Sequence, residues 1–401
     1  MTLDPATGQP ASSTAPTVDH GGEPQSMVQE ELPLLADPEP RTHERVEASI
    51  GGLAEAAPVF TASARIPYAG LLLALPALED TGLGGCVHAV YGSLRPGLYG
   101  LDTMLLETVL RTLAGEPRAE GATGLDPVAF GSILGMDRAP EVQTVRRRHR
   151  ELAARKQAEA LLEALGRHHL TTQGAEDGLG LVLYADGHVR SYQGTKKTAK
   201  QYSTRLKFPT PATMETWIAD HNGAPVFMVM AEPNSSLVGE LRRLVLTLRS
   251  MVGGGRRVVF GFDREGWSPH LFHELMQAGF DPLTWRKGET ENVDTGLFTR
   301  QSFTDQWGVV HEYAQVADTT VTLEYGPEKN KTRFEMRQIT RIVGTGTQAR
   351  EATGRDTRQI HLLTGNTELS AAELLYTMSS RWRQENYFSN GYWQVWDPLA
   401  G

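Results

Sequence analysis

Three acidic residues occupy positions from which they could bind a cation together. Asp186 ends the apolar run LVLYA, Asp263 ends the apolar run VVFGF, and Glu385 lies in the helical stretch SSRWRQENYFSN near the end of the chain. An apolar strand that ends in Asp places the carboxylate at the rim of a sheet, where a helix packed beside the rim could add a third acid. Carboxylate oxygens are the ligands that Mg²⁺ prefers, and Mn²⁺ accepts the same set.

A site of this kind could cut a phosphodiester bond. Two Mg²⁺ ions about 3.5–4 Å apart activate the attacking water or hydroxyl and relieve charge on the leaving oxygen. Because Mg²⁺ keeps waters and substrate phosphate among its ligands, three carboxylates suffice. The chain has a single cysteine, Cys86, which excludes an internal disulfide framework and a Cys-rich zinc site.

Each acid also has a purely structural interpretation. Asp186-Gly187 is a strong hairpin-turn signal on its own. Asp263 could cap the helix that follows it or pair with the neighbouring Arg264. Glu385 could pair with Arg381 one helical turn away. The three acids together, in this order of strands and helix, favour a shared metal site.

The elements that must position these acids fall into two regions. The first region is predicted to be helical, with helices over 101–115, 126–136 and 140–169, the last two resembling a helix-turn-helix pair. The second alternates strands and helices. Strands are predicted over 178–192, with a turn at Asp186-Gly187, and over 224–232, 256–266, 281–288 and 358–366. Helices are predicted over 235–255, 268–280 and 370–388, and antiparallel β hairpins over 308–326 and 333–344.

This pattern predicts an α/β fold, a mixed sheet flanked by helices, with an inserted β-rich subdomain and an N-terminal helical region. Residues 1–57 are predicted to be a disordered acidic tail, and 58–175 a helical region for DNA binding or dimerisation. The core is predicted to begin over 176–288, to be interrupted by the β subdomain at 289–350, and to end with the last strand and the Glu385 helix over 351–401.

The net charge of −9 is unevenly distributed. Residues 1–57 carry ten acidic and two basic side chains, so the remaining 344 residues carry 38 acidic and 37 basic ones. A nearly neutral body can still present a basic face, because phosphate binding depends on local patches. The charge therefore leaves DNA open as a partner. No signal peptide opens the chain and no apolar run is long enough to span a membrane, so we expect a cytoplasmic, nucleoid-associated protein.

The motifs around the three acids resemble those of bacterial insertion-sequence transposases of the DDE class, which have an RNase H-like catalytic core. The resemblance spans roughly residues 66–388. LYADGHVRSYQG resembles the strand of the first Asp, and VVFGFDREGWSPHLFHELMQAGFDPLTWRKG resembles the strand of the second Asp with its helix. RQIHLLTGNTELSAAELLYTMSSRWRQENYF resembles the closing strand and the Arg-Trp-x-x-Glu helix, and ILGMDRAPEVQTVRRR the helices that precede the core.

The resemblance implies that Asp186, Asp263 and Glu385 are catalytic and bind Mg²⁺ or Mn²⁺. It implies that Arg381 contacts a DNA phosphate or braces Glu385. The implied reaction is cleavage of DNA at the ends of a mobile element, followed by attack of the freed 3′-hydroxyl on target DNA. Transposon ends and target DNA are then the expected partners, with homodimerisation through the helical region and no membrane.

Two features depart from the family pattern. Related families carry a tyrosine three residues before the arginine and a lysine seven residues after the glutamate, where this chain has Met378 and Tyr392. The sequence also runs only 16 residues past Glu385, through the poor helix formers Ser-Asn-Gly. These departures suggest an alternative, a catalytically impaired, C-terminally truncated transposase that only binds DNA.

Two groups of basic residues are candidates for DNA contact. Lys196, Lys197 and Lys200 follow the first Asp strand, where they could contact phosphates or belong to a solvated loop. Arg146 and Arg147 lie on the helix predicted over 140–169, where they could enter the major groove or simply face solvent.

Arg286 and Lys287 follow Trp285 at the end of the strand after Asp263. This trio could stack on an unpaired base, although Trp285 could equally belong to the core. A further alternative for the whole chain is a helix-turn-helix regulator with an α/β ligand domain, which predicts carboxylates that do not converge.

Overall fold

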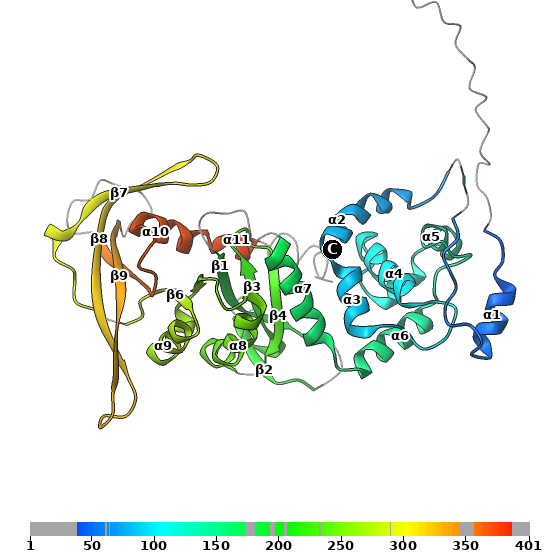
Figure 1. Cartoon of the computed structure of the whole chain (residues 1–401), viewed down its shortest axis with the longest axis horizontal. Helices are drawn as coiled ribbons and strands as arrows, with labels where there is room; N and C mark the ends of the chain where they lie inside the picture. The colour runs from blue at the N-terminus through cyan, green and yellow to red at the C-terminus, as the bar shows by residue number, and fades with distance from the viewer. Residues whose placement is uncertain are drawn as a thin grey trace, which may run out of the picture.

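The computed structural model describes residues 38–60, 62–63, 65–172, 181–192, 197–203, 207–231, 235–288, 290–344 and 357–386. The molecule is elongated (Figure 1). A helical unit occupies one end, a mixed sheet with helices on both faces lies in the middle, and a long pair of antiparallel strands forms the other end.

The helical unit has a core of its own. Its elements are α1 (Thr42–Ser49), η1 (Ala69–Ala74), α2 (Leu75–Asp80), α3 (Leu83–Tyr91), α4 (Leu101–Leu113), η2 (Ala119–Thr123), α5 (Pro127–Ile133), α6 (Val142–Ala154) and α7 (Ala158–Thr172). Leu110 and Val145 are completely buried at its centre and Phe130 is 1% exposed. Asp126 caps α5 by accepting from the Ala129 amide at 2.7 Å. The predicted helices at 101–115 and 126–136 are therefore confirmed, with shorter bounds.

The disordered tail predicted to reach residue 57 is wrong for residues 38–57. Helix α1 lies there, and Arg45 pairs with Asp137 at 2.5 Å while Arg41 donates to the Ala57 carbonyl at 2.6 Å. Ala56 is buried at 3% exposure. The composition of this segment predicts disorder, but Asp137, far along the chain, provides a partner for Arg41 and Arg45. Residues 1–37 lie outside the described residues.

The single long helix predicted over 140–169 is two helices. α6 ends at Ala154, Lys156 adopts a left-handed backbone with φ 54°, and α7 begins at Ala158. The Arg155 side chain binds the carbonyls of Tyr91 and Ser93 at 2.5 and 2.6 Å. These contacts with α3 and the loop after it hold the break, which residue periodicity does not reveal.

Within the described residues the sheet has ten strands. They are β1 (Leu181–Ser191), β2 (Lys200–Ser203), β3 (Phe208–Asp220), β4 (Pro225–Ala231), β5 (Val258–Phe262), β6 (Phe280–Trp285), β7 (Thr299–Thr304), β8 (Val310–Tyr325), β9 (Thr332–Gly344) and β10 (Thr357–Thr364). Their order is β2-β3-β1-β5-β6-β10-β9-β8-β7, and β4 pairs with β3. Strand β1 is antiparallel to β3 and parallel to β5, and β5 is parallel to β6.

Helices cover both faces of the sheet (Figure 1). They are α8 (Leu237–Val252), α9 (Pro269–Gln277), α10 (Ala371–Ser380) and α11 (Trp382–Asn386), with the short turns η3 (Arg264–Gly266) and η4 (Thr295–Leu297). On one face α8 and α9 pack on Leu183 of β1 and Phe260 of β5. On the other face Leu374 and Leu375 of α10 pack on Val182 of β1.

The predicted helices at 235–255 and 268–280 and the strands at 224–232, 256–266, 281–288 and 358–366 are confirmed with shifted ends. The turn predicted at Asp186-Gly187 is wrong, because β1 continues through both residues and pairs them with Trp217 and Thr216 of β3. Strand β3 itself was missed. Tertiary pairing here outweighs a strong local turn signal.

The β-rich segment at 289–350 does not stand apart from the core sheet. Strand β9 pairs with β10, and β10 pairs with β6, so β7, β8 and β9 extend the same sheet. In the described part of the chain no single helix is long and apolar enough to cross a membrane, although the bent pair Ala69–Asp80 and Leu83–Tyr91 meets the length and composition criteria together.

Candidate catalytic site

Asp186 and Asp263 lie side by side at the carboxyl ends of two neighbouring parallel strands. In the pairing of β1 with β5, Ala185 stands opposite Phe262, and the next residue on each strand is one of the two acids. The backbone of Asp263 remains extended, with φ −79° and ψ −176°. Because neighbouring strands lie about 4.8 Å apart, the two acids occupy adjacent backbone positions at this edge of the sheet.

Both acids face the side of the sheet that α10 covers. Successive side chains on a strand alternate between faces, so Asp186 shares a face with Tyr184, and Asp263 with Gly261. Tyr184 packs against α10 and its hydroxyl donates to the Thr377 carbonyl at 2.6 Å. Burial raises the pKa of Tyr184, so this phenol stays protonated as a donor. The two acids therefore lie on the face of the sheet that α10 covers.

Each acid has contacts that fix its side chain. Arg381 Nη1 lies 3.4 Å from Asp186 Oδ2, and the Gly187 amide donates to Asp186 Oδ1 at 3.0 Å. Asp263 Oδ1 accepts from the Glu265 amide at 2.8 Å and so caps η3. The helix after Asp263 is capped by Ser268 instead. Arg381 was expected to support Glu385 or to contact DNA. In the structure its guanidinium forms an ion pair with Asp186.

The helix that bears Glu385 is anchored over β3. Gln384, only 1% exposed, donates from Nε2 to the Trp217 carbonyl at 3.3 Å, and Trp217 is the residue that pairs with Asp186. This contact brings the backbone of α11 to the level of Asp186. Glu385 is the next residue in α11, but its side chain lies outside the described residues.

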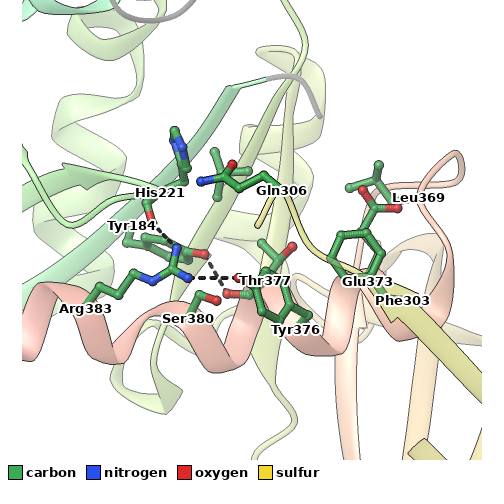
Figure 2. Close-up of a pocket in the computed structure, with 11 residues that line it drawn as sticks. Tyr184, His221, Phe303, Gln306, Leu369, Glu373, Tyr376, Thr377, Ser380 and Arg383 are labelled. Atoms are coloured by element: carbon green, nitrogen blue, oxygen red, sulfur yellow. Dashed lines mark hydrogen bonds between the residues drawn. The ribbon is translucent and has the colours of Figure 1, made fainter. Parts of the chain in front are cut away.

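Arg383 connects α11 to α10, to the turn after β3 and to the turn between β7 and β8. It donates to the Tyr376 hydroxyl at 2.9 Å and to the His221 carbonyl at 3.1 Å (Figure 2). Its guanidinium also lies over the ring of Trp307, 4.7 Å from the centroid, in the turn between β7 and β8. The cavity beside Arg383 measures about 30 Å³, enough for a water but not for a nucleotide. The contacts of Arg383 therefore fix the position of α11.

The side-chain oxygens of Asp186 and Asp263 are of a kind that binds divalent cations. Both acids supply hard carboxylate oxygens on adjacent strands, which suits Mg²⁺ or Mn²⁺. Within the described residues no group of three His, Cys, Asp or Glu side chains could hold a metal ion. Asp186 and Asp263 would therefore need a third ligand, for which Glu385 of α11 is the candidate from the sequence.

The predicted DNA-binding residues are dispersed. Lys197, Lys200 and Lys287 are exposed, whereas Lys196 lies outside the described residues. Arg286 donates to the side-chain oxygen of Gln338, and burial lowers the pKa of Arg286, so it is committed to the sheet.

The two arginines of α6 remain on the surface. Arg146 is exposed and pairs with the exposed Glu120, while Arg147 is exposed and forms no ion pair with another described residue. Trp285 packs in the core and lies under the guanidinium of Arg341 at 5.7 Å, so core packing describes it better than base stacking.

The sequence did not identify Trp217, Gln384, Arg383 or Trp307 as parts of this site. Gln384 and Arg383 flank the expected glutamate, so their place on the helix was available, but their partners lie on β3 and in the β7–β8 turn. Without β3, nothing in the sequence indicated what the buried face of α11 would contact.

The family described as Transposase protein matches residues 39–393. The chain belongs to this transposase family. The match covers the helical unit, the strands of both acids and the helix of Glu385. The resemblance to transposases is therefore confirmed, while the bacterial insertion-sequence and DDE assignments are not tested by it.

Two solved structures are distantly similar to this transposase family member. One is piggyBac transposase in a synaptic complex with hairpin DNA, at 10% identity, over 62% of this chain and 50% of that chain, with a TM-score of 0.33. The other is Aa-Ago with externally bound siRNA, at 11% identity over 64% and 36%, with a TM-score of 0.20. This chain spans half the length of the piggyBac chain. No curated protein sequence matches the chain.

Proposed function

We propose that this member of the transposase family cleaves DNA phosphodiester bonds and joins the freed end to target DNA during DNA transposition. The proposed site is the DDE type, with Asp186, Asp263 and Glu385 as ligands of Mg²⁺ or Mn²⁺. The three antiparallel strands β4, β3 and β1, continued by the parallel strands β5 and β6, support an RNase H-like core of the kind found in bacterial insertion-sequence transposases.

The observation that carries this proposal is the register of β1 and β5. It sets Asp186 and Asp263 at equal height at the carboxyl end of parallel strands, the usual edge for a site in an α/β sheet. Glu385, the proposed third ligand, follows the anchored Gln384 by one residue in α11.

The residues around the proposed site would have different roles in the cleavage reaction. When bound, a pair of divalent ions would activate the attacking oxygen and neutralise charge on the leaving one. Asp186, Asp263 and Glu385 would hold that pair. Arg381, 3.4 Å from Asp186, supplies positive charge where the scissile phosphate would lie. The contacts of Gln384 and Arg383 fix α11, and with it the position of Glu385.

The helical unit is the proposed binding region for the ends of the element. Arg146 and Arg147 lie on the exposed face of α6, the second helix of the α5–α6 pair, which suits entry into the major groove. Lys197, Lys200 and Lys287 are exposed and remain candidates for phosphate contacts, as does Lys196. Homodimerisation through this unit is part of the proposal.

The test is metal-dependent nicking of DNA that carries the sequences flanking the gene. Asp186→Asn and Asp263→Asn keep the size of the side chain and remove one anionic ligand, so we expect nicking to fall at least about a hundredfold. Asp80→Asn is the control, because Asp80 is an exposed residue of the helical unit. Wild-type nicking equal to that of Asp263→Asn would reject catalysis at this site.

One observation favours the alternative that the chain binds DNA without cutting it. The Arg381 guanidinium lies on Asp186, where it competes with a cation for the same oxygen. In that case the wild-type chain would bind DNA in a gel-shift assay, Mg²⁺ or Mn²⁺ would not raise nicking above background, and the two Asn variants would bind as the wild type does.

A further inference from the structure

Arg341 of β9 is a partly buried arginine without a counter-ion in the described part of the chain. Its guanidinium lies over the indole ring of Trp285, 5.7 Å from the centroid. The Arg341 Nε is buried, whereas the terminal nitrogens Nη1 and Nη2 reach solvent, and none of the three has a hydrogen-bond partner among the described residues. Nη1 and Nη2 can therefore donate to a ligand that approaches from solvent.

Trp285 is the neighbour of Asp263 across β5 and β6. Phe262 pairs with Thr284, and the next residues on these strands are Asp263 and Trp285. The Thr284 hydroxyl donates to the Asp263 carbonyl at 3.2 Å, so the two strands stay together at this point. Side chains alternate along a strand, and Trp285 shares a face with Leu283, which belongs to the cluster that α10 covers. Trp285 and Asp263 therefore lie on the same face of the sheet.

Strand β9 brings Arg341 to this face from two strands away. Leu362 of β10 pairs with Trp285 on one side and with Ile339 on the other. Because β10 is antiparallel to both neighbours, β9 runs in the same direction as β6. Arg341 follows Ile339 by two residues, so it shares the face of Ile339 and lies one step further towards the edge where β5 and β6 end. Its positive charge is thus beside the edge that carries the two acids.

The environment of Arg341 favours an anionic ligand. Burial lowers the pKa of Arg341, although the nearby Tyr313 raises it, and an arginine remains charged at neutral pH in either case. A partly buried charge without a counter-ion costs free energy, which a bound anion would recover. The contact with Trp285 orients the guanidinium but does not neutralise it. The planar fork of Nη1 and Nη2 matches the oxygens of a phosphate.

We propose that Arg341, held over Trp285, binds a DNA phosphate that flanks the scissile bond. This inference rests on the proposed cleavage function and adds a contact with the substrate on the same face of the sheet. The phosphate would lie on the β6 side of Asp263. Such a contact holds the DNA strand in place relative to the acids, so Arg341 is a substrate-binding residue of the proposed site.

The experiment measures how strongly DNA binding depends on salt. Each phosphate contact that a protein makes with duplex DNA lowers the slope of log K against log salt by about 0.9. The full chain is titrated, in EDTA and at several salt concentrations, with a fluorescent duplex that carries the sequences flanking the gene. Arg341→Gln removes the charge. Arg333→Gln is the matched control, because Arg333 lies on the same strand and is 71% exposed in a pair with Glu324.

We expect Arg341→Gln to reduce the steepness of the salt dependence by about 0.9 and the affinity about tenfold, while Arg333→Gln behaves as the wild type does. The melting temperature of Arg341→Gln should not fall, because no ion pair is lost. Arg341→Lys keeps the charge and loses the fork, so it should keep the wild-type slope with a smaller loss of affinity. A role in packing alone would change the melting temperature and leave the slope unchanged.

A neutral methylphosphonate placed at one phosphate at a time locates the contact. The wild type should lose about tenfold in affinity when the neutral group lies within about two nucleotides of the nick, and Arg341→Gln should lose nothing further there. The inference is overturned if Arg341→Gln keeps the wild-type slope and affinity, if Arg333→Gln lowers them equally, or if the sensitive phosphate is remote from the nick.

Failure of this inference and failure of the cleavage proposal give different results. Wild-type nicking together with an unchanged slope for Arg341→Gln would reject only the contact made by Arg341. Binding without nicking would reject cleavage, and the slope would still decide whether Arg341 contacts a phosphate. Asp263→Asn should lose nicking and keep the effect of Arg341→Gln on the slope. A wild-type chain that does not bind the duplex would reject both proposals.

Discussion

Asp220 shows how much a single carboxylate can organise in this fold. It is 4% exposed at the end of β3, and its Oδ1 accepts from the amides of Asn222 and Ala224, both at 2.9 Å. Its Oδ2 accepts from His169 of α7, also at 2.9 Å. One side chain therefore closes the turn between β3 and β4 and fastens the last helix of the helical unit to the sheet.

The charge on Asp220 should make stability depend on pH. Burial favours the neutral acid, but the hydrogen bonds from His169 and from the Ala224 amide outweigh it, so the pKa of Asp220 lies below 3.8. A carboxyl whose pKa is lower in the folded state stabilises the protein above its unfolded pKa. This contribution is lost as the pH falls from about 4 through the folded value.

Asp220→Asn tests this contribution. At pH 7 we expect the variant to lose about 1–3 kcal/mol of unfolding free energy, because a charged acceptor becomes a neutral one. Near pH 3 the gap between variant and wild type should narrow. Urea denaturation at pH 7, 5 and 3 measures it, with Asp80→Asn as the control. A gap that is constant over this range would contradict the assignment.

At this scale the sequence predicted where two of the three candidate acids lie in the sheet. Apolar runs that end in Asp predicted where Asp186 and Asp263 lie, and the register of β1 with β5 then brought them together. The ion pair between Arg381 and Asp186 could not be predicted, because the helical spacing of Arg381 and Glu385 favoured a local partner. Arg381 and Asp186 are 195 residues apart in the sequence, so the spacing of nearby residues cannot indicate their contact.

At the scale of elements, the errors have two physical causes. Strand β3 was missed because Pro209 and Pro211 weaken the strand signal in FPTPATMETWIAD, although the structure accommodates both prolines at its start. The turn at Asp186-Gly187 was predicted from local preference and is overridden by pairing with β3. Both errors come from the same unseen strand.

The break between α6 and α7 gives a prediction for a single residue. Lys156 has φ 54°, a left-handed conformation that costs a residue with a Cβ about 1–2 kcal/mol. Glycine adopts this conformation without that cost but loses more entropy on folding. We therefore expect Lys156→Gly to raise the unfolding free energy by about 0.5–1 kcal/mol, measured by urea denaturation.

Lys156→Ala provides the control for this prediction. It removes the same charged side chain and keeps the Cβ, so its stability should stay within about 0.5 kcal/mol of the wild type. If Lys156→Gly were destabilising, the helix would have to continue through residue 156, and the single helix predicted from the sequence would be the better description in solution.

At the scale of the whole molecule, the sheet joins segments that the sequence separates. Residues 289–350 were predicted to form an inserted subdomain, yet β9 pairs with β10 over eight residue pairs and β10 with β6 over three. Ile339 of β9 and Leu362 of β10 share one buried cluster with Leu374 of α10. The face that carries the acids is thus built partly from the inserted strands.

The shared cluster predicts which elements a substitution in β9 should destabilise. Ile339 is completely buried, and Ile339→Ala should cost about 2–5 kcal/mol of unfolding free energy. Because the cluster joins β9 to β10 and α10, hydrogen–deuterium exchange should speed up across all three and not in β9 alone. Nicking should then fall as well, since α10 leads directly into α11.

A matched substitution in the same segment isolates the cause. Leu297 is 55% exposed in η4, so Leu297→Ala should leave both exchange and nicking near the wild-type level. If Ile339→Ala raised exchange only within residues 299–344, those strands would unfold by themselves and the subdomain predicted from the sequence would be the right unit. Faster exchange in α10 would instead mean that the strands between Asp263 and Glu385 help to hold the third acid in place.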